Sequence, residues 1–379
     1  MTDRSLLLVA GEASGDLHAA RLLAELRPFV PEFRAFGLGG EELAAAGQEQ
    51  LAESREVAVV GVREALRVLR RAREIFQAIL REAERSRPAA AVLVDFAEFN
   101  LRLAGALHRR GIPIIYYISP QVWAWRRGRV RKIRRTVDEL LVLFAFEESF
   151  FRAHGVTAHH VGHPLIDEVP PLLPRHERSS SPAKPLRLAL LPGSRRSEID
   201  HLLPAMLGAV RLLHDRLPVE ARIVQAPSVE GSWLASHLER AGLDLPFVTA
   251  NRFEEIAASD LAFCASGTAT LEVGLLRTPM IVVYRLAPSS MFLARLLVKL
   301  PNFSLVNLVL GREVVPELLQ GQVRAESLAA AAAGLLTDRE RRVRMSADLA
   351  GLRPRLGAPG AARRAAERVA ARLRAAGWS

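Results

Sequence analysis

Short apolar runs alternate with longer stretches of helical period along the first half of the chain. Four runs rich in Val, Ile and Leu lie at residues 5–10, 89–96, 113–118 and 139–144. These runs are continuously apolar and lack the apolar–polar alternation of half-exposed strands. Continuous apolar runs are typical of buried parallel strands. Between the first two runs, apolar residues at positions 62–80 recur with the period of an α-helix. This order predicts a parallel sheet with helices on both faces.

The same rhythm restarts after a polar stretch at residues 178–185, whose composition is that of a linker. Further strand-like runs lie at 186–191, 221–226, 260–265 and 280–284, and residues 323–376 have a helical pattern. We therefore expect an α/β fold in which two Rossmann-like domains face a cleft. Its parts are a first domain at 1–178, a second at 186–345, and C-terminal helices at 346–379 that pack on the first domain or on a partner subunit.

Charge narrows the class of partner without identifying it. The chain has 379 residues, a net charge of +11 and a single cysteine, Cys264. One cysteine excludes an intrachain disulfide and fits a reducing cytoplasm. Seven of the ten residues at 126–135 are basic, and they follow Trp123 and Trp125. Such a stretch is suited to nucleic acid, to an anionic membrane or to the phosphates of a small ligand.

Three familiar cofactor signatures are incomplete or absent. Residues 37–42 begin like a dinucleotide fingerprint, but Glu42 stands where the third glycine belongs. No glycine-rich stretch ends in Gly-Lys-Ser or Gly-Lys-Thr. His159, His160 and His163 are close in sequence but lack carboxylates or cysteines at zinc spacing. We therefore expect neither a cofactor nor a metal.

Two strand ends in the first half carry candidate chemistry. Residues 11–16, GEASGD, follow the first strand and form either an ordinary helix-capping turn or a cradle for a ligand. Asp95 follows another buried strand, where a carboxylate serves equally well as a general base or as a helix cap. The sequence leaves both pairs of alternatives open.

Two strand ends in the second half suit phosphate. Residues 191–198 contain Ser194 and Arg195 before a helix, and residues 265–272, ASGTATLE, place small residues before another helix. Amides at a helix start and guanidinium groups both favour anions, although each turn is also an ordinary capped helix start. Glu272 either accepts hydrogen bonds from a ribose diol or lies on a solvated helix face. Together the two turns predict a nucleotide diphosphate in the second domain, which is the arrangement of a two-domain glycosyltransferase.

The order of these motifs resembles that of the bacterial lipid-A-disaccharide synthase family from Leu8 to about Gln320. The motifs that match are AGEASGD at 10–16, SPQVWAW at 119–125 with its basic continuation, VGH at 161–163, LLPGSR at 190–195, ASGTATLE at 265–272, PMIVVYR at 279–285 and NLVLGRE at 307–313. One motif departs from the family: DFAEFN at 95–100 stands where the family has DAPDFN, so Glu98 replaces an aspartate.

The resemblance implies GT-B architecture, no cofactor, and an inverting transfer from UDP-2,3-diacylglucosamine to 2,3-diacylglucosamine 1-phosphate. The products are the β-1,6-linked disaccharide 1-phosphate and UDP. The resemblance also implies a cytoplasmic homodimer bound peripherally to the anionic inner membrane, with no nucleic acid partner. The candidate residues are Asp95 and Glu12 for catalysis; Ser194, Arg195, Ser266, Gly267, Thr268 and Glu272 for UDP; Asn307 and Arg312 elsewhere in the active site; and Arg126, Arg127, Arg129 and Arg131 for acceptor or membrane phosphate.

Two rival interpretations remain at this point. An RNA-binding protein would use the basic run at 126–135, but the turns around Arg195 and Thr268 would then have no purpose and no RNA-binding module is recognisable. Another UDP-sugar enzyme, such as a 2-epimerase or a transferase of peptidoglycan synthesis, would share the phosphate-binding turns. The motifs at 119–125 and 307–313 favour the lipid A enzyme.

Overall fold

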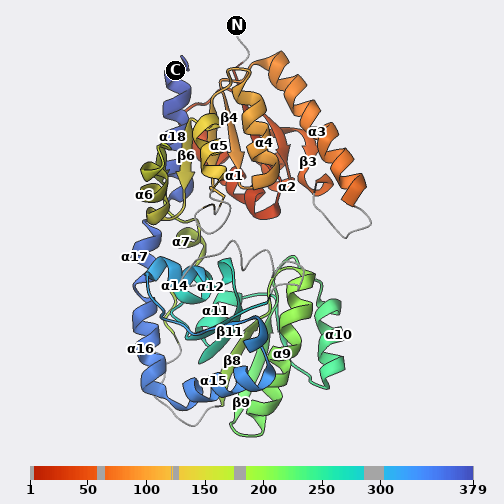
Figure 1. Ribbon diagram of the computed structural model, residues 1–379, viewed down its shortest axis with the longest axis vertical. Coiled ribbons are helices and arrows are strands. Elements are labelled where there is room, and N and C mark those ends of the chain that lie inside the picture. Colours follow the sequence, from red (N-terminus) through yellow and green to blue (C-terminus); the bar gives the residue numbers. More distant parts are fainter. Residues whose placement is uncertain are drawn as a thin grey trace. The chain divides into compact units, whose positions relative to one another are not determined.

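The computed structural model describes residues 4–57, 65–120, 122, 128–174, 185–285 and 303–378 (Figure 1). The chain divides into two compact units, the first formed by Met1–Pro164 with Leu356–Ser379 and the second by Leu165–Arg355. Each unit has its own sheet, and all strand pairs within each sheet are parallel. The predicted α/β fold with two Rossmann-like domains is confirmed.

The first unit's sheet has, among the described residues, seven strands in the order β3-β2-β1-β4-β5-β6-β7. The four predicted strands are present, and the first has the predicted bounds. The edge strands β3 and β7, which are polar or short, were not predicted, and neither was β2, whose sequence RAFGLG contains two glycines and begins with an arginine. The strands are β1 (Ser5–Ala10), β2 (Arg34–Gly39), β3 (Gln48–Glu53), β4 (Ala90–Val94), β5 (Ile114–Tyr117), β6 (Glu139–Val142) and β7 (Ala158–His160).

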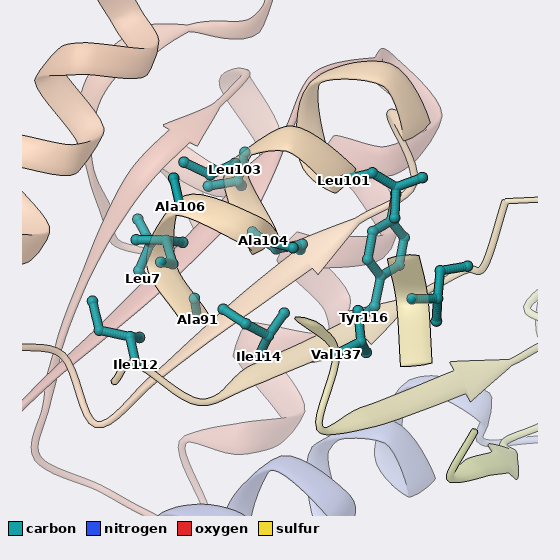
Figure 2. Packing of buried hydrophobic residues seen from close by; sticks show 14 of the residues in the cluster. Leu7, Ala91, Leu101, Leu103, Ala104, Ala106, Ile112, Ile114, Tyr116 and Val137 are labelled. Carbon is teal, nitrogen blue, oxygen red and sulfur yellow. The ribbon is translucent and has the colours of Figure 1, made fainter. Parts of the chain in front are cut away.

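One face of this sheet packs against three helices that follow β3, β4 and β5. Figure 2 shows the resulting apolar cluster, in which Tyr116 of β5 lies beside Leu101 of α4 and Val137. On α5, Val130, Ile133 and the following Val137 are buried as the sequence predicted, which leaves the basic side of that helix outward. The helices of this unit are α1 (Ala13–Leu26), α2 (Glu41–Ala45), α3 (Ala65–Ser86), α4 (Ala97–His108), α5 (Arg129–Thr136), α6 (Ala145–Ala153) and α18 (Ala361–Ala375).

The second unit's sheet has, in the described part of the chain, six strands in the order β10-β9-β8-β11-β12-β13. Its strands are β8 (Leu186–Leu191), β9 (Val219–Val224), β10 (Phe247–Val248), β11 (Leu261–Ala265), β12 (Met280–Tyr284) and β13 (Glu317–Leu319). Its helices are α7 (Leu165–Glu168), α9 (Arg196–His214), α10 (Gly231–Ala241), α11 (Arg252–Ala257), α12 (Thr268–Leu275), α14 (Leu305–Leu310), α15 (Ala325–Thr337) and α16 (Arg339–Leu349), followed by α17 (Leu352–Leu356).

The unit boundaries differ from the expected ones. The chain enters the second unit at Leu165 rather than within the polar stretch at 178–185. Just after α7, the carbonyl of Val169 accepts a hydrogen bond from Arg353 of the same unit (3.1 Å). At the other end, α16 belongs to the second unit and only the residues from Leu356 onward belong to the first. In the first unit α18 packs against α1.

A buried histidine makes the stability of the first unit dependent on pH. His163 is 5% exposed, and burial lowers its pKa to about 3, with the nearby His18 and His160 acting in the same direction. The imidazole of His163 therefore binds a proton near pH 6.5 in the unfolded chain but only near pH 3 in the folded chain. The free energy of unfolding falls as pH drops from about 6.5 towards 3. At pH 5 we expect the burial of a neutral His163 imidazole to lower the free energy of unfolding by about 2 kcal/mol relative to pH 7 or above.

His163→Gln should therefore lose less stability than the wild type between pH 7 and pH 5 in urea unfolding. His108→Gln, at an exposed position on α4, is the matched control and should keep the wild-type dependence. Equal pH dependence in the wild type and His163→Gln would contradict the assignment.

Candidate active site

The first cluster of candidate residues lies where β1 and β4 end. These strands are neighbours, with Ala10 paired to Val94, so the residues that follow them share one edge of the sheet. The turn after β1 also lies against the turn after β4, because a side chain at Gly11 would come within 2.2 Å of the ring of Phe96. Glu12 is exposed, and its side chain makes no capping hydrogen bond. The structure therefore brings Glu12 and Asp95 to adjacent turns.

The backbone at Asp95 is strained. Asp95 and Phe96 both have φ of 48°, in the left-handed region that costs a non-glycine residue about 1–2 kcal/mol. The fully buried Asn100 donates from Nδ2 to the carbonyl oxygen of Asp95 (2.9 Å), and the hydroxyl of Tyr116 donates to the same oxygen. Strain of this kind persists only where the surroundings impose it, and it is concentrated at functional sites.

Charges near this turn are arranged around a buried phenol. Burial raises the pKa of Tyr116 well above its ordinary value; the charge of Asp95 acts in the same direction and that of Arg129 in the opposite one. Tyr116 therefore remains a neutral donor at physiological pH. Arg129, the first residue of α5, forms an ion pair with Glu98 of α4. Within its unit, Arg129 thus lies at the turn that carries Asp95.

The four arginines expected to contact phosphate differ in exposure and in whether the structure describes them. The side chain of Arg129 is only 17% exposed and paired, whereas Arg131 lies on the exposed side of α5. Arg126 and Arg127 lie outside the described residues, as do Trp123 and Trp125. Among the described residues of this basic run, Arg131 and the exposed basic residues near it on α5 are therefore the candidates for contact with phosphate.

The second cluster lies where β8, β11 and β12 end. β11 pairs with β8 on one side and β12 on the other, which brings the turn at Ser194–Arg195 next to the turn at Ser266–Thr268. Arg195 is 72% exposed, and its guanidinium lies 3.4 Å from Glu198, an exposed contact of little energetic value. The two turns that suit phosphate are thus brought together.

The turn after β11 leaves space for a ligand. Gly267 has φ of 155°, and a side chain placed on it would meet no atom of the described residues within 4 Å. Thr268, the first residue of α12, is exposed, while Ser266 donates from its hydroxyl to the carbonyl of Phe303 (3.4 Å). An anion could approach the amides at the start of α12 without a steric clash.

Two aromatic side chains, not singled out as site residues from the sequence, border this cluster. Tyr284 ends β12, and its ring stacks on that of Phe303 with 6.4 Å between centroids. Burial raises the pKa of Tyr284; the charge of Glu198 raises it further and that of Arg195 opposes this. Phe303 is 38% exposed, which is unusual for a large apolar side chain in this protein. Tyr284 lies in the PMIVVYR motif, but only the fold shows that it neighbours Arg195.

Glu272 is mostly covered and does not lie on a solvated helix face. Its side chain is 12% exposed and pairs with Arg252 at 3.0 Å, so the alternative of a solvated helix face is excluded. Burial raises the pKa of the Glu272 carboxyl, and Arg252 acts against that rise. Arg252 begins α11, twenty residues earlier, and no spacing in the sequence connects it to Glu272.

Asn307 and Arg312 have structural partners. Asn307 is fully buried; its Nδ2 donates to the carbonyl of Val315 (2.8 Å) and to Glu317 (2.9 Å), and its Oδ1 accepts from the amides of Val314 (2.8 Å) and Val315 (3.1 Å). Arg312 is exposed and paired with Asp348 at 2.7 Å. The side chain of Asn307 therefore holds the segment before β13 in place.

The three clustered histidines do not form a metal centre with other described residues. No group of three or more His, Cys, Asp or Glu side chains suitable for a metal ion occurs in the described ranges. His160 instead contacts the carbonyl of Leu143 through Nε2 (3.1 Å), while His159 contacts Arg368 and His163 is buried.

Comparison with known proteins identifies a family that this chain matches over nearly its whole length. Residues 6–367 match the family described as lipid-A-disaccharide synthetase. A lipid-A-disaccharide synthase of Myxococcus xanthus is 44% identical over 368 residues, which cover 96% of each protein. Two solved structures are similar in fold alone. A putative UDP-N-acetylglucosamine 2-epimerase of Listeria monocytogenes has a TM-score of 0.63 at 13% identity, covering 99% of this chain and 97% of that one. Acinetobacter baumannii MurG has a TM-score of 0.58 at 14% identity, with coverages of 92% and 95%.

The hydrogen bonds of Asn307 predict a structural effect of its removal. Asn307→Ala would leave buried amides and a carbonyl unpaired and deprive Glu317 of a donor, so we expect a loss of about 2–4 kcal/mol in the free energy of unfolding, measured in urea. Arg312→Ala, at an exposed pair, should leave the unfolding midpoint nearly unchanged. An Asn307→Ala protein with wild-type stability and no turnover would instead indicate direct contact with substrate.

Proposed function

This chain belongs to the lipid-A-disaccharide synthase family and is a hexosyltransferase of lipid A biosynthesis, and we propose that it transfers 2,3-diacylglucosamine from UDP to 2,3-diacylglucosamine 1-phosphate. The products are the β-1,6-linked disaccharide 1-phosphate and UDP. The observation that carries the proposal is the strained turn at Asp95 in one unit together with the paired phosphate-suited turns in the other.

The second unit is the proposed site of the UDP moiety. The guanidinium of Arg195 and the amides at the start of α12 offer donors to the diphosphate, and Ser194, Ser266 and Gly267 line the same two turns. Such preorganised donors stabilise charge that grows on a departing diphosphate and do not require a metal. In this proposal Glu272, one turn further along α12, binds the ribose.

Asp95 is the proposed general base. The acceptor's 6-hydroxyl is a poor nucleophile until its proton is removed, and Asp95 takes that proton as the oxygen attacks C1 of the donor sugar. The bond between C1 and the β-phosphate oxygen breaks, and its electron pair leaves with UDP. Inversion at C1 requires the base on the face opposite the diphosphate. In this proposal the first unit, which carries Asp95, binds the acceptor, and the second unit binds the nucleotide. Glu12, on the adjacent turn, is the reserve candidate.

The rival functions have weaker support. The 2-epimerase and MurG are similar to this chain in fold, but identities of 13% and 14% are too low to indicate that this chain shares their activities. The 44% identity to a lipid-A-disaccharide synthase across nearly the whole chain favours lipid A chemistry, and it favours an enzyme over an RNA-binding protein.

Turnover by the purified protein tests the function and the base together. With UDP-2,3-diacylglucosamine and the acylated acceptor, we expect UDP release and a new disaccharide by mass spectrometry. Asp95→Asn keeps the shape of the side chain but is a far poorer proton acceptor, so kcat should fall by about 10²–10⁴ while UDP affinity stays near that of the wild type.

Glu12→Gln is the matched comparison on the neighbouring turn. If Asp95→Asn turned over at nearly the wild-type rate while Glu12→Gln was inactive, the base would be Glu12. Absence of UDP release by the wild type with both substrates present would overturn the proposed reaction itself.

Peripheral attachment to the anionic inner membrane, as a cytoplasmic homodimer, completes the proposal. No helix in the described part of the chain is both long and apolar enough to cross a bilayer. The outward side of α5 carries Arg131, Lys132, Arg134 and Arg135, and burial together with the nearby Arg102 and Arg129 lowers the pKa of Lys132. Crowded cations of this kind attract anionic lipid headgroups.

Binding to anionic vesicles should therefore weaken as salt rises, because exposed charges are screened within about 8–10 Å at moderate ionic strength. Neutralising Arg131, Arg134 and Arg135 to Gln should weaken binding by about a hundredfold, since each basic residue near such a surface contributes about 1 kcal/mol. The control is the same change at Arg339, Arg341 and Arg344, which begin α16 or lie within it. Attachment that is insensitive to salt and to the α5 changes would indicate apolar insertion.

A further inference from the structure

The ion pair between Arg252 and Glu272 joins two helices beside the proposed nucleotide site. Arg252 begins α11, and Glu272 lies one turn into α12, after the open turn at Gly267. The guanidinium donates to Oε1 of Glu272 at 3.0 Å. No residue in the described part of the chain donates to Oε2, so one carboxylate oxygen is held and the other remains available as an acceptor.

Burial makes Arg252 important for the charge of Glu272. Burial is the largest influence on the pKa of this carboxyl and raises it, and the nearby Glu168 acts in the same direction. Arg252 opposes both through its charge and its hydrogen bond. A carboxylate accepts hydrogen bonds from hydroxyl donors more strongly than a neutral carboxylic acid does, and the charge and hydrogen bond of Arg252 favour the charged form.

Arg252 itself is held in place from a second side. Its guanidinium lies over the ring of Phe253, 4.5 Å from the centroid, and its side chain is 30% exposed. A guanidinium fixed both by a ring and by a carboxylate restricts the rotamers of its partner, and this reduces the entropy that Glu272 would lose on binding a ligand.

We infer that Arg252 is a positioning residue that fixes Glu272 as the acceptor for the ribose hydroxyls of the donor nucleotide. The inference rests on the proposed function, since it takes the bound group to be a uridine diphosphate. Arg252 touches Glu272 and not the reacting atoms, so it acts on nucleotide selection through the carboxylate. A ribose diol, which has two hydroxyl donors, matches an acceptor whose second oxygen is available.

The test compares UDP with 2′,3′-dideoxy UDP, which lacks both hydroxyls, by calorimetry on the full chain. The wild type should bind UDP about 10- to 100-fold more tightly, the range for hydrogen bonds to a charged group. Arg252→Gln should weaken UDP binding and leave the dideoxy affinity almost unchanged, so that the ratio falls towards one. Arg252→Lys, which keeps the charge, should restore part of the ratio.

Arg222→Gln is the matched control, because Arg222 pairs with Glu255 of α11 in the same unit at 3.4 Å. It should retain the wild-type ratio. Equal weakening of both nucleotides in Arg252→Gln, with the ratio preserved, would show a general charge effect and overturn the inference. Equal affinity of the wild type for both nucleotides would overturn the ribose role of Glu272. A wild type that binds neither nucleotide would instead contradict the proposed function.

Discussion

Parallel pairing of every described strand places the carboxyl ends of neighbouring strands along one edge of each sheet. In the first unit the pairing of Ala10 with Val94 brings Glu12 and Asp95 to adjacent turns. In the second, the pairing of β11 with both β8 and β12 gathers Arg195, Thr268 and Tyr284. Residues far apart in the sequence thus become neighbours through strand order alone, and the proposed acceptor and donor sites both depend on this arrangement within their own units.

Buried polar side chains hold these turns in conformations that the backbone would not adopt alone. Asn100 and Tyr116 bind the carbonyl of Asp95, where two successive residues are left-handed. Asn307 holds the segment before β13 with four hydrogen bonds, and the partly exposed Arg252 pairs with the carboxylate of Glu272. Losing one such partner leaves a buried group unpaired, which is costly, so rigidity at the site and stability of the fold are coupled.

The two ends of the chain are combined in one unit. α18 packs on α1, and Arg368 of α18 pairs with Glu139 at the start of β6 and contacts His159 at 2.9 Å. Phe33 and Trp378 also lie together, with 5.8 Å between ring centroids. The first unit is therefore complete only after the last helix has been synthesised, although its sheet is formed by residues before Pro164.

The sequence alone determined the elements whose signal is local. The runs at 5–10, 186–191 and 280–284 are strands with the predicted bounds, because strands buried on both faces are continuous apolar runs. It also predicted the α/β class, the family and the turns at Asp95, Arg195 and Thr268, since small and charged residues after a buried strand indicate strand-end chemistry. The sequence did not predict the short edge strands or the unit boundary at Leu165, because these depend on contacts with distant segments of the chain. Tertiary structure alone decided that Asn307 is enclosed, that Arg129 pairs with Glu98, and that Glu272 is buried against Arg252. Burial and ion pairing are properties of residues brought together across many positions, and no local pattern of one sequence encodes them.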